Sequence, residues 1–124
     1  MRKITISVEN LSIAAEMFDT PTAQRILEAL PLESTVNVWG DEIYFDIPLN
    51  LDQESDAHAD VEMGDLAYWP DGPAFCIFFG PTPVSTGDQP RAYSPVNVFG
   101  RVIGDVKQLK TVSSGAAIKV TRVD

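Results

Sequence analysis

The single thiol of the chain, Cys76, is its strongest potential nucleophile. It lies in the apolar segment 74–79, where strand-like alternation separates Cys76 from two phenylalanines and an isoleucine on the opposite face. A reactive thiolate needs a neighbouring base or another cause that lowers its pKa. The only histidine, His58, lies in a different segment, and nothing in the sequence connects it to Cys76. We therefore interpret Cys76 as a packed, unreactive thiol, since free cysteine is among the residue types most often buried.

An acidic stretch at residues 50–62 is the second place where side chains suggest chemistry. Potential metal ligands occupy every second position: Asp52, Glu54, Asp56, His58, Asp60 and Glu62. Carboxylates of this kind can hold Ca²⁺ or Mg²⁺, and a histidine with carboxylates can hold a transition metal. However, the spacing matches no calcium loop, and the stretch contains no glycine. We interpret it as a solvated, mobile loop and expect neither a metal nor a cofactor.

Four aromatic side chains with polar tips form the third group: Trp39, Tyr44, Trp69 and Tyr93. Along residues 42–47, alternation places Glu42, Tyr44 and Asp46 on one face, with apolar residues on the other. Such aromatics either pack in the core and at its rim, or they line a shallow groove with Glu42 or Arg91 as a polar anchor. The sequence leaves both interpretations open for Tyr44 and Trp69.

The elements that must position these residues are mostly short strands. Alternation and turn residues predict strands at 3–8 and 11–18, two within 35–47 around Gly40-Asp41, and others at 63–69, 74–79, 96–103, 108–112 and 117–123. A helix is predicted over 21–30. Thr20 would cap it, Pro21 would occupy its first turn, and Ala23, Ile26, Leu27 and Leu30 would face inward. Residues 80–95, with four prolines, are expected to form a loop.

This pattern predicts a mainly β fold formed by one domain that spans residues 1–124. We expect a closed antiparallel β-barrel of about eight strands with one or two capping helices. A barrel of this size is filled by its own side chains, so a binding site must lie on the outer face or the rim.

The composition excludes several classes of partner. Nine basic and 18 acidic residues give a net charge of −9, which disfavours nucleic acid and anionic membrane surfaces. One cysteine allows no intramolecular disulfide, and no segment approaches the roughly 20 apolar residues that cross a bilayer. The beginning of the chain lacks the apolar run of a signal peptide. We expect a cytoplasmic protein.

Several motifs resemble those of the cyclophilins, the peptidyl-prolyl isomerase barrels. Pro21, Thr22, Ala23 and Leu30 resemble the start of the cyclophilin helix, GPAFCIFFG resembles a central strand, and NVFGRVIGDVKQL resembles a later strand and helix. The combination VNVWGDEIYF, GDLAYWPDG, FCIFFGPTPVS and SPVNVFGRV is similar to a group of small prokaryotic cyclophilin-like proteins. The resemblance covers most of the chain and implies a cyclophilin-like barrel.

The functional residues of cyclophilins are not found at the corresponding positions of this sequence. Aligned without gaps, Ala74 stands where cyclophilins have a glutamine and Cys76 where they have a groove phenylalanine. Arg91 stands where they have a tryptophan, and Val96 where they have a histidine. The resemblance places the catalytic arginine on a strand near residues 39–47, but no arginine occurs anywhere from residue 26 to 90. Because that arginine weakens an amide whose rotation barrier is about 18–20 kcal/mol, we expect little or no isomerase activity.

The resemblance also implies a groove on the outer face of the barrel. Its expected residues are Tyr44, Trp69, Cys76, Phe78, Arg91 and Tyr93. The favoured hypothesis is a module that binds a small molecule or a peptide there, with Arg91 favouring a carboxylate ligand. The alternatives are a divergent peptidyl-prolyl isomerase and a subunit-like interaction module. The identity of the ligand and the oligomeric state stay open.

Overall fold

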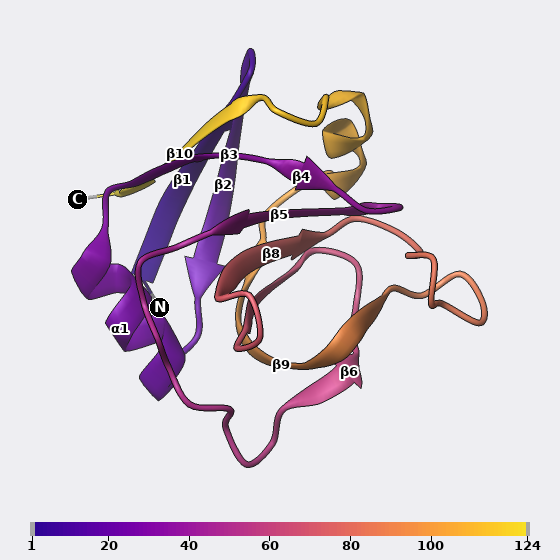
Figure 1. The fold of residues 1–124 in the computed structure, drawn as a ribbon. Coiled ribbons are helices and arrows are strands. Elements are labelled where there is room, and N and C mark those ends of the chain that lie inside the picture. Colours follow the sequence, from indigo (N-terminus) through magenta and orange to yellow (C-terminus); the bar gives the residue numbers. More distant parts are fainter. Residues whose placement is uncertain (1, 124) are drawn as a thin grey trace.

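The computed structural model describes residues 2–123, which form ten strands, one α-helix and one 3₁₀-helix. The strands are β1 (Arg2–Val8), β2 (Leu11–Met17), β3 (Leu32–Thr35), β4 (Asn37–Val38), β5 (Glu42–Asp46), β6 (His58–Asp60), β7 (Asp65–Trp69), β8 (Ala74–Phe78), β9 (Arg91–Val102) and β10 (Ala117–Arg122). The helices are α1 (Pro21–Ala29) and η1 (Val106–Thr111). Figure 1 shows α1 at one end of the strongly curved sheet and η1 near the hairpin of β4 and β5. The prediction of a mainly β antiparallel fold with a helix is confirmed.

The strands hydrogen-bond in the order β3-β10-β1-β2-β9-β7-β8-β5-β4, with β6 attached to β9. This order is an open path, because no ladder joins β3 to β4 within residues 2–123. Strand pairing therefore does not establish the expected closed barrel, and the described sheet has ten strands instead of about eight. The two ends of the path are consecutive in the chain, since only Val36 separates β3 from β4.

Helix α1 begins as its sequence predicts. The Thr20 hydroxyl accepts a hydrogen bond from the Ala23 backbone N–H at 3.1 Å, and Pro21 occupies the first turn, where its missing N–H costs no helical hydrogen bond. Ala23, Ile26 and Leu27 are buried in the main core, and Leu30 packs against it partly buried. The helix thus covers apolar side chains of the sheet.

The two faces of β8 contribute to two separate apolar clusters. Phe75 and Ile77 belong to the main core, together with Ile4, Ile6 and Val8 of β1. Cys76 and its alternation partners point to the opposite face and join a smaller cluster, which we call the outer cluster: Val61, Ala67, Ala74, Cys76, Phe78, Ala92 and Val96. Alternation along the strand separates the two sets, as expected from the sequence.

Three segments differ from the sequence-based expectation. In the segment 108–112, where a strand was expected, residues 108–111 belong to the 3₁₀-helix η1 and Val112 follows its end. Val106, Leu109 and Val112 are buried at a spacing of three residues, which suits a 3₁₀-helix. The expected loop 50–62 ends in strand β6, which finds its hydrogen-bonding partner in β9. Strand β9 begins at Arg91, inside the expected proline-rich loop.

Strand β9 accommodates Pro95 because its pairing is irregular there. Asp60 pairs with Arg91, but His58 pairs with Val96, so the register shifts across the proline, which has no N–H to donate. A second irregularity places Leu66 opposite Gly100 and Ala67 opposite Val98. A side chain at Gly100 would meet the backbone oxygen of Glu16 at 2.5 Å, so the close approach of β2 and β9 requires glycine.

Within the described residues, none of the helices has the length and apolar character needed to cross a membrane.

Candidate functional site

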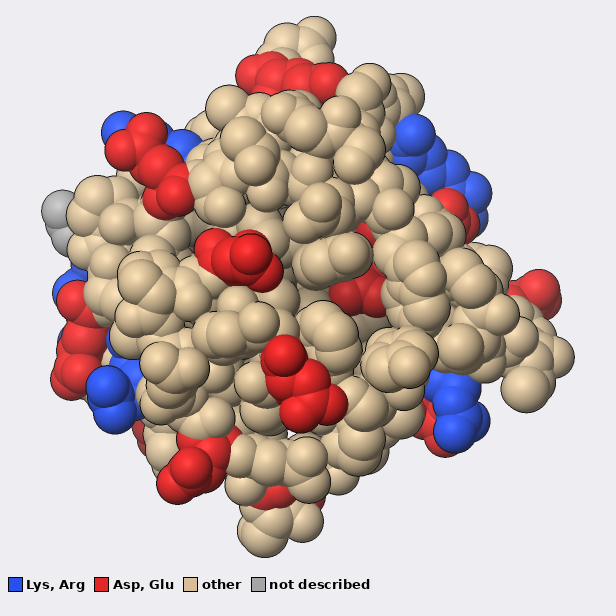
Figure 2. Space-filling view, viewed as in Figure 1, with Lys and Arg blue, Asp and Glu red and all other residues tan. Residues whose placement is uncertain are grey.

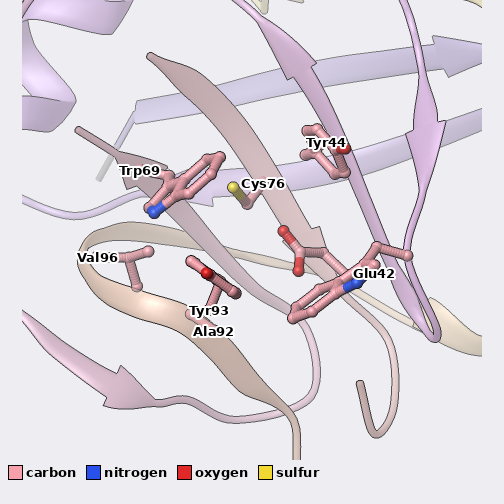
Figure 3. A pocket seen from close by; sticks show the side chains of 8 residues that line it. Glu42, Tyr44, Trp69, Cys76, Ala92, Tyr93 and Val96 are labelled. Carbon is pink, nitrogen blue, oxygen red and sulfur yellow. The ribbon is translucent and has the colours of Figure 1, made fainter. Parts of the chain in front are cut away.

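A pocket with a volume of about 210 Å³ lies on the outer face of the sheet. We call it the aromatic pocket, and its lining residues are Trp39, Glu42, Tyr44, Trp69, Cys76, Ala92, Tyr93 and Val96. These residues come from the turn before β5 and from strands β5, β7, β8 and β9. Figure 3 shows the side chains of Glu42, Trp69, Cys76 and Tyr93 directed toward a common space. Most of the lining surface is therefore aromatic or aliphatic, with one carboxyl group among it.

The strand register brings these side chains together. Cys76 of β8 pairs with Tyr44 of β5 on one side and with Ala67 of β7 on the other. Glu42 lies two residues before Tyr44 on the same face of β5, diagonally across from Cys76. Trp69 likewise lies two residues beyond Ala67. Neighbouring strands thus supply one face of the pocket at fixed positions.

The aromatic rings contact one another in a continuous series. Tyr44 meets Trp69 at a centroid distance of 6.5 Å and an interplanar angle of 78°, and Trp69 meets Tyr93 at 6.1 Å and 79°. Tyr93 then meets Trp39 at 6.1 Å and 71°. Edge-to-face contacts at these distances are favourable for aromatic pairs. The rings therefore form walls at steep angles to one another and do not stack.

Trp69 is held in place by polar contacts outside the ring system. Its indole N–H donates to the Ser94 hydroxyl at 2.7 Å, and that hydroxyl donates to the Asp71 carboxylate at 3.0 Å. Tyr93, by contrast, is 71% exposed and lines the pocket at its solvent side. One wall of the pocket is thus fixed by hydrogen bonds, and the other is accessible from water.

Glu42 supplies the carboxyl group of the pocket, and its environment shifts the pKa of that group. The residue is only 5% exposed, and burial raises the pKa of its carboxyl from 4.5 to about 7, against the smaller opposite effect of a hydrogen bond with the Cys76 side chain. Half of the Glu42 carboxyls are therefore ionised near neutral pH. A carboxyl with a raised pKa inside a cleft is a recognised mark of a functional site.

Cys76 lies at the base of the pocket and is 1% exposed. Burial raises the pKa of its thiol well above the ordinary value, and the negative charge of Glu42 and the hydrogen bond to Glu42 raise it further. The thiol therefore stays protonated at neutral pH, in agreement with its interpretation as an unreactive side chain.

The structure brings together four of the six residues expected in the groove: Tyr44, Trp69, Cys76 and Tyr93 all line the aromatic pocket. Phe78 is fully buried in the outer cluster and does not line the pocket. Arg91 also lies outside the pocket, in an exposed ion pair in which its Nη1 is 3.2 Å from Oδ1 of Asp60. Such surface pairs contribute at most about 1 kcal/mol. The expected preference for a carboxylate ligand depended on Arg91 in the groove, and Arg91 does not line the aromatic pocket.

The other four lining residues are Trp39, Glu42, Ala92 and Val96, of which the sequence indicates Trp39 as a candidate groove aromatic and Glu42 as a candidate polar anchor. Trp39 and Glu42 carried a signal in the sequence, because Trp39 is an aromatic residue with a polar tip and Glu42 shares the strand face of Tyr44. Ala92 and Val96 carried none, since small aliphatic side chains line a pocket only through their position in β9. Their place in the pocket depends on how β9 pairs with β7, and no local pattern in the sequence indicates this pairing.

The acidic stretch 50–62 is attached to the fold through Asn97, which is 1% exposed. The Asn97 amide donates to the backbone oxygen of Asp52 at 2.9 Å and to the Thr22 hydroxyl at 3.1 Å, and its oxygen accepts from the Glu54 N–H at 2.8 Å. The Glu54 carboxylate in turn accepts from the Thr22 N–H. These hydrogen bonds attach the first part of the stretch, at Asp52 and Glu54, to β9 and α1, which its composition did not predict.

No group of three or more His, Cys, Asp or Glu side chains is positioned to hold a metal ion in the part of the chain from residue 2 to 123. Figure 2 shows acidic side chains spread over one face of the molecule, with basic side chains mainly at its margins. On this face the acidic side chains are thus separated and do not form one cluster of potential ligands.

Comparison with known proteins agrees with this architecture. A family profile described as cyclophilin-like matches residues 2–121. The chain belongs to the cyclophilin-like family. A cyclophilin-like relative of known structure is a hypothetical protein from Archaeoglobus fulgidus, solved in solution. It is 39% identical, with a TM-score of 0.82 over 98% of this chain and 95% of the other. No curated protein matches this cyclophilin-like chain.

Proposed function

We propose that this cyclophilin-like protein binds a small molecule or a short peptide segment in the aromatic pocket. The observation that carries the proposal is the combination of four aromatic side chains with one buried carboxyl, Glu42, in a preformed hollow. Apolar walls with a few polar groups are typical of small-molecule sites. A rigid support favours binding as well, because the walls lose little freedom when a ligand enters.

We further propose that the pocket does not efficiently catalyse proline isomerisation. No lysine or arginine lines it, among the residues that the structure describes, and Arg91 is paired with Asp60 outside it. An isomerase needs a positive group or strong hydrogen-bond donor beside the prolyl nitrogen to weaken the amide resonance. The charged group in the pocket is instead the carboxylate of Glu42, whose negative charge cannot weaken the amide resonance in this way.

The test of binding is a fragment screen followed by amide NMR. Neutral, cationic and anionic fragments are added to the labelled protein, and we expect shifts that cluster at residues 42–44, 69, 76 and 92–96. Tyr93→Ala removes an exposed wall, so it should weaken the shifts while the protein stays folded. Ile103→Ala is the matched control, because Ile103 is an exposed apolar residue outside the pocket. Shifts that are absent, or equal in both variants, would refute the proposal.

The alternative function, a divergent peptidyl-prolyl isomerase, is decided by a protease-coupled assay with a proline-containing tetrapeptide. We expect no acceleration over the uncatalysed rate at micromolar protein. Efficient turnover that disappears in Glu42→Gln or Tyr93→Ala would place isomerase chemistry in the aromatic pocket. Turnover that disappears in Arg91→Ala would instead assign it to the exposed arginine.

Three wider expectations accompany this proposal. We propose that residues 32–38 close the sheet into a barrel, supported by the continuity of β3 and β4 and by the hydrogen bonds of Val36 with Ala116 and Gly115. We also propose a single cytoplasmic domain that spans residues 1–124. Its net charge of −9 makes nucleic acid and anionic membranes unfavourable partners.

A further inference from the structure

We propose that the aromatic pocket binds an alkylammonium group, carried by a small molecule, between the aromatic rings and the carboxylate of Glu42. This inference rests on the binding function proposed above and names the class of ligand. It reverses the sign of the ligand charge expected from the sequence, because the charged residue that the structure places in the pocket is Glu42 and not Arg91.

The first argument is the charge of the pocket. Glu42 is the one residue with a formal charge at neutral pH among the residues found to line it. It is 5% exposed, so few water molecules can solvate its ionised form. A cationic group that enters the pocket replaces this missing solvation, whereas an anionic group would be repelled at short range. The overall charge of −9 adds a longer-range attraction for cations.

The second argument is the arrangement of the rings. Trp39, Tyr44, Trp69 and Tyr93 meet at interplanar angles of 71° to 79°, so no ring face in this series is covered by a parallel partner. Ring faces attract cations through the aromatic quadrupole, and tryptophan does so most strongly. Aromatic walls that surround a carboxylate therefore suit a group that is both apolar and positively charged. An alkylammonium group has both properties.

The third argument is size. The pocket volume of about 210 Å³ is below the range of about 300–1,000 Å³ that is typical of sites for drug-sized ligands. It therefore suits a compact head group better than an extended cofactor. Its open side is formed by Tyr93, which is 71% exposed, so the remainder of a ligand can extend into solvent there.

The charge state of Glu42 makes the inference sensitive to pH. The other titratable groups that line the pocket are Tyr44 of β5, Cys76 of β8 and Tyr93 of β9, and no lysine, arginine or histidine is among the lining residues described. Since burial raises the pKa of Glu42 to about 7, the ionised fraction rises about tenfold between about pH 6 and pH 8. A permanent cation should therefore bind up to about tenfold more tightly at the higher pH.

The experiment compares three probes of nearly equal shape by amide NMR and calorimetry at about pH 8. Choline is a permanent cation, 3,3-dimethylbutan-1-ol is its neutral isostere, and 3,3-dimethylbutanoate is an anion of similar size. We expect choline to bind at least about tenfold more tightly than the neutral isostere, with shifts around the aromatic pocket, and the anion to bind least. A short peptide with trimethyllysine is the fourth probe. Weaker binding than choline supports a small-molecule source, and tighter binding overturns that part of the proposal.

Two substitutions and one control separate charge from shape. Glu42→Gln keeps the size of the side chain and should weaken choline binding at least about tenfold, with no remaining dependence on pH. Tyr93→Leu should weaken it about threefold or more, whereas Tyr93→Phe should retain it. Asp46→Asn is the control. It removes an exposed carboxylate from the same strand but outside the pocket, so choline binding should be unchanged.

The possible results of these experiments distinguish the ammonium inference from the proposed binding function. If the neutral isostere or the anion binds in the pocket as tightly as choline, the ammonium inference is overturned and the binding function stands. If Asp46→Asn weakens choline binding as much as Glu42→Gln, the attraction is a general effect of net charge and the inference also fails. If no probe shifts any amide around the pocket, both the inference and the proposed binding function are wrong.

Discussion

Replacing Glu42 by glutamine should stabilise the protein increasingly as the pH rises. In the folded protein, burial raises the pKa of this carboxyl from 4.5 to about 7. Between these values the unfolded chain releases its proton while the folded protein retains it, so the free energy of unfolding of the wild type falls with rising pH. The contribution of Glu42 to stability is therefore greatest below about pH 4.5, is lost through this window and levels off above about pH 7. Glutamine does not ionise in this range, so the variant does not lose stability in this way as the pH rises.

The size of the effect follows from the difference between the two pKa values, which is about 2.5. One pKa unit corresponds to about 1.4 kcal/mol, so the full loss of stability is about 3.5 kcal/mol, of which about 2.5 kcal/mol falls between about pH 5 and pH 8. No large discount for solvent screening is needed, because the residue is only 5% exposed. The pKa of Asp65 is also raised, chiefly by burial, but that residue is present in both proteins and cancels in their difference.

The assay is urea unfolding of the wild type and of Glu42→Gln at several values between about pH 5 and pH 8. The quantity of interest is the variant's free energy of unfolding minus that of the wild type, which should rise by about 2.5 kcal/mol across this range. Asp46→Asn serves as control, since its side chain on the same strand is exposed and its difference should stay nearly flat. If the curves of Glu42→Gln and the wild type are parallel, burial does not perturb Glu42, and the charge argument for the pocket fails.

Three further predictions concern the support of the pocket and the core. Leu27→Ala should lower the free energy of unfolding by about 2–5 kcal/mol, because the side chain is 6% exposed in the main core, and a loss below about 0.5 kcal/mol in denaturant titrations would contradict this packing. Asn97→Ala should cost on the order of 3 kcal/mol and speed amide hydrogen exchange in residues 50–57, because it removes three hydrogen bonds of a buried amide; unchanged exchange would show that the loop is held by other contacts. Cys76 should react with a bulky aromatic disulfide only after unfolding, because the thiol is 1% exposed and its pKa is raised well above the ordinary value; fast labelling of the folded protein at neutral pH would overturn this.

The local elements are predictable because their causes lie close together in the sequence. The alternation of Ile4, Ile6 and Val8 requires a strand with one buried face, and this face is buried in the main core. Thr20 and Pro21 define the beginning of α1 through capping and a restricted φ angle. The same alternation correctly separates Cys76 from Phe75 and Ile77. The family resemblance adds the order in which such elements occur along the chain.

Segments whose form depends on a distant partner are not predictable in this way. Residues 58–60 (His, Ala and Asp) have no strong strand pattern of their own, and they form a strand because β9 offers hydrogen bonds to them. The first part of the acidic stretch, at Asp52 and Glu54, is held by Asn97, more than 40 residues away in the chain. The composition of a segment shows how little apolar surface it can bury, and on that basis it predicts mobility. It does not show the hydrogen bonds that another element supplies to the segment.

The sequence by itself determined the strand and helix faces, the side of β8 on which Cys76 lies, and the aromatic character of any groove beside it, because these follow from period and side-chain chemistry. Only the tertiary structure decided which polar group the aromatics surround. Arg91 and Tyr93 both lie near the start of β9, but Tyr93 lines the pocket whereas Arg91 pairs with Asp60 across the ladder to β6. Glu42 enters the pocket because the register of β5 and β8 sets it diagonally across from Cys76, where burial disfavours its charge. Register and desolvation are properties of the assembled sheet, and they decide which charged side chain lines the pocket.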